Sequence, residues 1–168
     1  HKAVREARNI EVQWTPLERA YYDAVYEIYR RKAADSGGPA AFIMQMPLRQ
    51  AASCLPAMRE ILIAKDEIQW SDEYDSDTGG ADLSGLLIDP EAQQGRILAT
   101  QLPVDSKFDA FEKALREALT VGSGQAMVFS YFRKTLEYLL RRLSGEFRVG
   151  LMYGPTKTEE RQRIIADF

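Results

Sequence analysis

Two short loops of the chain combine residue types that suit an anionic ligand. Their hydroxyl, cationic and glycine residues are Ser130, Tyr131 and Arg133 in the first loop, and Gly154, Thr156 and Lys157 in the second. Hydroxyl and cationic groups bind phosphate oxygens, and a glycine lets the backbone approach a phosphate closely. Ordinary helix caps use the same residue types, so the loops could instead serve only to begin helices.

An apolar run precedes each loop, over residues 126–129 and 147–152, and a helical pattern follows it. Such runs separated by a helix predict two parallel strands joined by a right-handed crossover. The carboxyl ends of parallel strands share one edge, where open α/β sheets bind ligands. Each loop at that edge would lead into a helix N-terminus, which favours anions. The sequence therefore predicts a strand–helix–strand–helix unit with an anion site at its edge.

The helix after the second loop offers a structural alternative for that loop. Thr156 and Glu159 have the spacing of a capping box, in which the threonine hydroxyl would bind the backbone of its own helix. Arg161 lies one turn into this helix, and its depth favours bracing the loop over contacting a ligand.

The N-terminal part of the chain, residues 1–64, is mainly helical by its pattern. A weak alternation of apolar and polar residues over 10–14 predicts a short strand at its beginning. Thr15 and Glu18 then have the spacing of a capping box for a long helix, and two shorter helical patterns follow it.

Charge is distributed unevenly along the chain. Residues 65–103 crowd acidic side chains among glycine and serine, which is typical of a flexible linker, and they lack the spacing of a calcium loop. Arg30, Arg31 and Lys32 complement the dipole of a helix end, with contact to a DNA backbone as the alternative. The net charge of -3 gives no overall indication of nucleic-acid binding, so such binding would depend on a local basic patch.

Several kinds of chemistry are excluded by residues that the sequence lacks. His1 is the only histidine and Cys54 the only cysteine, so an internal disulfide, a Ser/His/Asp triad and a zinc site cannot form within the chain. No Gly-Lys dipeptide is present, which excludes a Walker A phosphate loop. We therefore expect no catalytic residue, no metal ligand and no membrane span in the chain, a buried role for Cys54, and a cytoplasmic location.

Longer motifs of the chain resemble the SWI/SNF-type ATPases, which are double-stranded DNA translocases of helicase superfamily two. In the C-terminal half the matching residues are Asp105-Ser106-Lys107-Phe108, Val128-Phe129-Ser130, Thr135-Leu136-Glu137-Tyr138-Leu139, Gly154, Thr156, and Glu160-Arg161 through Ile164 to Phe168. In the N-terminal half, residues 12–25 and 48–58 are similar to the bacterial branch that includes the RNA-polymerase-recycling ATPase. Pro155 departs from the family pattern, which usually has a small residue or serine there.

The resemblance implies an α/β fold for residues 104–168, as the first half of the second RecA-like lobe. It implies that residues 1–64 are the helical segment between the lobes and that residues 65–103 link the two parts. Since the pattern breaks off at Phe168, we expect the chain to be a fragment of a longer protein. That parent would use ATP and Mg²⁺ to move along double-stranded DNA, and this fragment would bind neither cofactor.

By the same resemblance, the residues of the two loops would contact the DNA phosphate backbone. The alternative is a protein-interaction module, in which a helical hairpin and a small α/β unit bind a protein partner within a larger complex. A small flavodoxin-like enzyme is a third possibility, and it is disfavoured because the sequence contains too few strand patterns.

Overall fold

The computed structural model describes residues 7–35, 40–63, 101–121 and 124–168. The predicted acidic linker over residues 65–103 lies outside these ranges up to residue 100. Within the described ranges every regular element is an α-helix.

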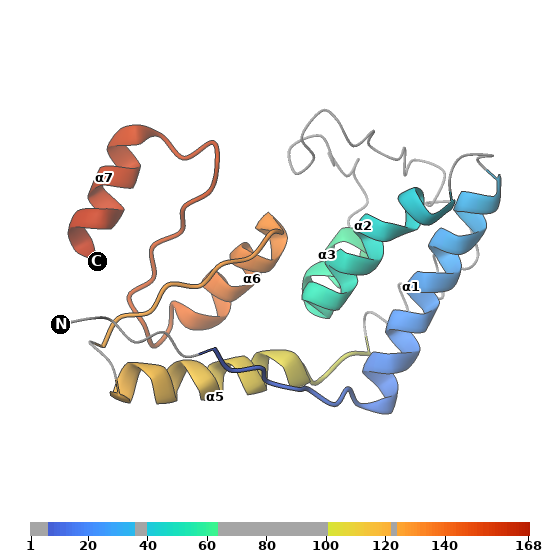
Figure 1. Cartoon of the computed structure of the whole chain (residues 1–168), viewed down its shortest axis with the longest axis horizontal. Coiled ribbons are helices and arrows are strands. Elements are labelled where there is room, and N and C mark those ends of the chain that lie inside the picture. The colour runs from blue at the N-terminus through green and yellow to red at the C-terminus, as the bar shows by residue number, and fades with distance from the viewer. Residues whose placement is uncertain (1–6, 36–39, 64–100, 122–123) are drawn as a thin grey trace.

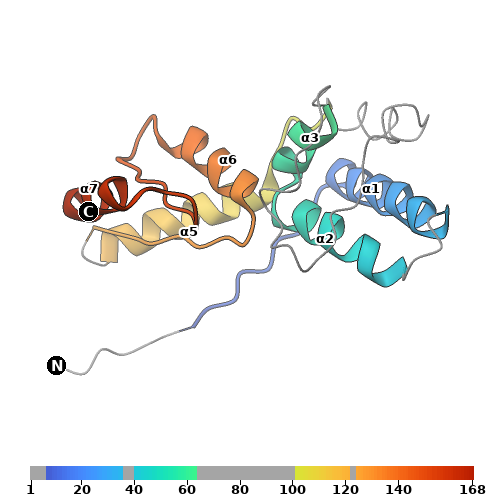
Figure 2. The ribbon, with the colours of Figure 1, turned by 90° about the horizontal axis from the view of Figure 1, so that it is seen from above.

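The helices, in chain order, are α1 (Pro16–Asp35), α2 (Ala40–Ser53), α3 (Leu55–Ile63), α5 (Ser106–Val121), α6 (Arg133–Leu143) and α7 (Thr158–Asp167). Figure 1 shows α1, α2 and α3 as one group, with α6 beside α3 and α5 along the lower edge. In the view turned by 90°, α5, α6 and α7 lie at the opposite end of the molecule from α1 and α2 (Figure 2). The helical N-terminal segment and the C-terminal segment therefore meet where α3 faces α6.

The first helix begins at the capping box that the sequence predicts. The Thr15 backbone N–H donates to Glu18 Oε2 (2.7 Å), and the Glu18 N–H donates to Thr15 Oγ1 (3.2 Å). These two bonds occupy N–H groups that the geometry of a helix start leaves without a partner. The prediction of a capping box at the start of α1 is therefore confirmed.

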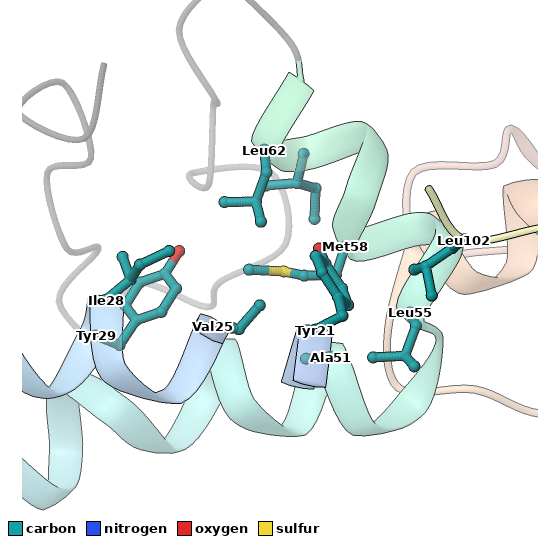
Figure 3. Close-up of a cluster of buried hydrophobic side chains, with 10 residues drawn as sticks. Tyr21, Val25, Ile28, Tyr29, Ala51, Leu55, Met58, Leu62 and Leu102 are labelled. Carbon is teal, nitrogen blue, oxygen red and sulfur yellow. The ribbon is translucent and has the colours of Figure 1, made fainter. Parts of the chain in front are cut away.

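The described residues form two cores, and the first lies between α1, α2 and α3, as Figure 3 shows. Its buried apolar side chains are Tyr21, Val25, Ile28, Tyr29, Ala51, Leu55, Met58, Ile61, Leu62 and Leu102. The four residues from α1 recur at helical spacing, so they form a single apolar face. Leu102 comes from the residues just before α5, and it packs in this core although it falls within the predicted linker range.

The second core lies between α3, α5 and α6. Its buried side chains are Cys54, Ala57, Phe108, Tyr138 and Leu143. Burial raises the pKa of the Cys54 thiol to about 12, so the thiol stays protonated at neutral pH. The interpretation of Cys54 as a buried, small apolar residue is confirmed. Cys54 and Ala57 belong to this core and Met58 to the first, so the start of α3 connects the two.

The start of α5 joins the two groups of helices through hydrogen bonds. Ser106 donates its backbone N–H to Glu18 Oε1 (2.8 Å) and its hydroxyl to Glu18 Oε2 (2.7 Å). Asp105 caps α5 by accepting the Phe108 N–H (3.0 Å), and its other oxygen accepts the Tyr138 hydroxyl (2.7 Å). Because Glu18 belongs to α1 and Tyr138 to α6, these bonds hold α5 against both groups.

The strands predicted over residues 10–14, 126–129 and 147–152 do not form in the described structure. No backbone hydrogen bond joins the second of these segments to the third. Met127 and Phe129 are 74% and 85% exposed, so no second layer covers the apolar run before α6. Parallel sheets need cover on both faces, and two strands alone are marginally stable. The predicted α/β unit is corrected accordingly: its helices form and its strands do not.

Candidate nucleic-acid interface

The first predicted loop leads into α6 without a side-chain cap. Ser130 Oγ accepts a hydrogen bond from the Phe132 N–H (3.2 Å), which closes a local turn before the helix. Phe132 is buried, whereas the neighbouring Tyr131 is 66% exposed. The Ser130 hydroxyl accepts in this turn and keeps its own proton for donation, and the Tyr131 ring lies at the surface.

The second predicted loop is a tight turn immediately before α7 (Figure 1). Thr156 Oγ1 accepts from the Tyr153 N–H (3.0 Å), and the Thr156 N–H donates to the Tyr153 carbonyl (3.0 Å). These bonds close the turn around Gly154 and Pro155. The predicted capping box that begins at Thr156 is wrong, because Lys157 occupies the N-cap position and no side chain caps α7.

Arg161 braces this second loop, as the sequence predicts. Its Nε donates to the Thr156 carbonyl (3.0 Å), and its Nη2 donates to the carbonyls of Gly154 (2.7 Å) and Tyr153 (3.2 Å). The guanidinium thus binds the backbone of the loop at three points. The conformation of the loop is therefore coupled to the first turns of α7.

Arg133 connects the two loops. Its guanidinium carbon lies 4.4 Å from the centre of the Tyr153 ring, which is a cation–π contact. Its Nε also forms an ion pair with Glu137 Oε1 (2.8 Å), and Lys134 pairs with the other oxygen of Glu137 (3.1 Å). Burial would raise the pKa of Glu137, but the bonds from Lys134 and Arg133 outweigh it and lower that pKa. The carboxylate is therefore charged at neutral pH and offsets part of the positive charge.

Lys157 and Gly154 lie in the open part of the second loop. Lys157 is exposed and forms no ion pair with another residue of the described ranges. A Cβ placed on Gly154 would meet nothing within 4 Å, so the backbone of this turn is accessible from outside. Of the two cations predicted for the site, Lys157 is the one whose charge no neighbouring carboxylate offsets.

Arg49, from α2, is a residue of this surface that the loop motifs did not reveal. Its guanidinium carbon lies 5.3 Å from the centre of the Tyr131 ring. The two residues are far apart in the sequence, and no local pattern connects them. They meet because α3 packs on α6, and Ser53 at the end of α2 shares a hydrogen bond with Thr135 in the first turn of α6.

The surface formed by the two loops carries hydrogen-bond donors and positive charge. Such donors bind phosphate oxygens without reading base sequence. Among the residues that the structure describes, no group of three or more His, Cys, Asp or Glu side chains could hold a metal ion. Over the same part of the chain, no helix has the length and apolar character needed to cross a membrane.

Comparison with known proteins gives a family match for part of the chain. No curated protein and no solved structure matches the chain. Residues 106–168 match the family model described as the helicase conserved C-terminal domain. The matched range starts with the first residue of α5 and includes both loops and α7. Residues 106–168 therefore carry a helicase-type C-terminal domain sequence, the class of domain for which a RecA-like fold is expected.

Proposed function

We propose that the chain is a fragment of an ATP-dependent, double-stranded DNA translocase of the SWI/SNF type, from the bacterial branch. Its part in that enzyme is to hold the DNA phosphate backbone through the residues of two loops, which are Ser130, Tyr131, Arg133, Gly154, Thr156 and Lys157. The match of residues 106–168 to the helicase C-terminal family supports the class of enzyme. The SWI/SNF type and the bacterial branch are supported by the sequence motifs alone.

The contact between Arg133 and Tyr153 is the observation that carries this proposal. It brings the loop before α6 to the loop before α7, at a ring-to-cation distance of 4.4 Å. The starts of two helices thus lie beside Lys157 and two hydroxyls that can donate, and a helix N-terminus favours an anion through its dipole. A phosphodiester backbone offers anionic oxygens at regular intervals, which suits such a set of donors.

Two observations lead us to place the ATP and Mg²⁺ sites elsewhere. The sequence has no Gly-Lys phosphate loop, and the described residues contain no group of three or more His, Cys, Asp or Glu side chains that could hold a metal ion. Our proposal therefore assigns both cofactors to other parts of a longer protein and gives this chain no catalytic residue. Its contribution is the positioning of DNA.

We test the proposal by substituting Lys157. In a binding assay of the 168-residue chain with a duplex of arbitrary sequence, Lys157→Ala is expected to weaken affinity roughly three- to tenfold. Loss of one phosphate contact should also reduce the steepness of the plot of log affinity against log salt by about 1. The measurement is fluorescence anisotropy over a salt titration.

The matched control is Lys113→Ala, because Lys113 is an exposed lysine on α5 outside both loops. This variant should keep the affinity and the salt dependence of the unmodified chain. Equal effects of the two substitutions would mean that general positive charge, rather than the surface of the two loops, attracts DNA.

A further inference from the structure

The guanidinium of Arg49 is placed at the surface in a way that leaves its donors available. Arg49 is exposed on α2, and it lies over the ring of Tyr131 at 5.3 Å. That ring is itself held edge-to-face against the buried Phe132, at 5.2 Å. The five N–H donors of a guanidinium lie in its own plane, so a cation–π contact with a ring leaves them able to bind an anion.

Arg49 differs from the other two arginines of this surface. Arg133 is paired with Glu137, and Arg161 binds the carbonyls of its own loop. No hydrogen bond or ion pair engages the Arg49 side chain among residues 7–35, 40–63, 101–121 and 124–168, apart from its stacking on Tyr131. Its charge and its planar set of donors are therefore available to an anion.

The position of Arg49 beside the first loop depends on contacts beyond its own stacking. Ser53, at the end of α2, shares a hydrogen bond with the buried Thr135 of α6 (3.1 Å between the hydroxyl oxygens). Lys107 of α5 donates to the Ala52 carbonyl (2.7 Å), and Arg141 of α6 pairs with Glu60 of α3. These contacts hold the end of α2 against the C-terminal segment, so Arg49 stays close to Tyr131.

We propose that Arg49 is a further phosphate contact, supplied to the DNA interface by the helical N-terminal segment. This inference rests on the proposed function and extends its site from the two loops onto α2. The DNA backbone then lies across the boundary between the two segments, with Lys157 on one side and Arg49 on the other. Duplex binding is thereby sensitive to how the helical segment sits on α6.

The test measures the affinity of the 168-residue chain for a duplex of arbitrary sequence over a range of salt concentrations. Arg49→Ala is expected to weaken binding roughly three- to tenfold. It should also reduce the slope of log affinity against log salt by about 1, the value for one phosphate contact. Arg49→Lys keeps the charge and should recover most of that loss. Tyr131→Leu removes both the aromatic support of Arg49 and the uncharged Tyr131 hydroxyl while Arg49 retains its charge, so it should weaken binding by only about two- to threefold with nearly unchanged salt dependence.

The control is Arg19→Ala, which removes an exposed arginine of α1 that is already paired with Asp23. It should change neither the affinity nor its salt dependence. If Lys157→Ala weakens binding and Arg49→Ala does not, the Arg49 contact is refuted while the proposed function stands. If the unmodified chain does not bind duplex DNA, or if neither substitution matters, both proposals are refuted.

Discussion

Replacing Glu18 with alanine is expected to lower the free energy of unfolding by about 2–4 kcal/mol. Glu18 is 1% exposed, and its carboxylate accepts hydrogen bonds from the Thr15 N–H, the Ser106 N–H and the Ser106 hydroxyl. Alanine would leave these donors without partners and would separate α1 from the start of α5. Chemical denaturation followed by circular dichroism measures the loss.

The effect of Glu18 should depend on pH in a defined direction. Burial would raise the pKa of Glu18, but the hydrogen bonds from Thr15 and Ser106 outweigh it and lower the pKa below its usual value of 4.5. A carboxylate with a lowered pKa contributes its full stabilisation above the unfolded-state pKa and loses it as the pH falls through the folded-state value. The stability difference between the unmodified chain and Glu18→Ala should therefore be constant near neutral pH and shrink below about pH 4. A difference that stays constant into acid would contradict this role of the carboxylate.

Substituting Gly150 with alanine is expected to displace α7, at a cost of about 1–3 kcal/mol to the docking of that helix. A Cβ at Gly150 would lie 2.6 Å from Ile164 Cγ2, so the Ile164 side chain, or the helix that carries it, would have to shift. Because α7 contains no fully buried residue, it should move away while the rest of the fold persists. Faster amide hydrogen exchange confined to α7 and its preceding loop is the expected signature.

Two further variants test whether the contact with Ile164 causes the expected displacement of α7 in Gly150→Ala. Gly145→Ala is the control, because a Cβ there meets nothing within 4 Å and Gly145 does not have a positive φ. The double variant Gly150→Ala with Ile164→Ala should restore much of the protection, since the Ile164 Cβ lies 3.6 Å away, an ordinary contact distance. If the amide exchange rates in α7 were the same in Gly150→Ala and in the unmodified chain, the close contact between Gly150 and Ile164 would not be what positions α7. Since Lys157 is the N-cap residue of α7, displacement of the helix should also weaken DNA binding.

The helices could be predicted from the sequence because their signals are local. Thr15 and Glu18 mark the start of α1, and Asp105 caps α5 with a bond to the backbone of Phe108. Apolar residues at helical spacing then indicate which faces are buried, and the core residues of α1 bear this out. Each of these features depends on residues within a few positions of one another.

The strands could not be predicted reliably because a strand needs partners that its own residues do not specify. The apolar runs over residues 126–129 and 147–152 have the composition of buried strands, yet Met127 and Phe129 are largely exposed in the structure. Composition indicates that a segment could be covered, whereas pairing depends on what lies beside it. The same limit applies to residues 10–14, where Trp14 instead packs on Tyr22 of α1.

In the candidate site, too, contacts within one element could be predicted from the sequence, whereas contacts between separate elements could not. Bracing by Arg161 was predictable, since it lies within one turn of the loop that it binds. The contacts of Arg133 with Tyr153 and of Arg49 with Tyr131 were not, because they join residues from separate elements. Thr156 was expected to cap α7, but the helix begins later and the hydroxyl closes the preceding turn.

The salt dependence of duplex affinity, measured for two duplexes of equal length and unrelated sequence, tests the proposed phosphate interface most directly. We expect the chain to bind both duplexes equally, with log affinity falling linearly against log salt at a slope of about −2 to −3, as two or three phosphate contacts require. Absence of binding at low salt, a slope near zero, or a clear preference for one sequence would contradict a phosphate interface at the two loops.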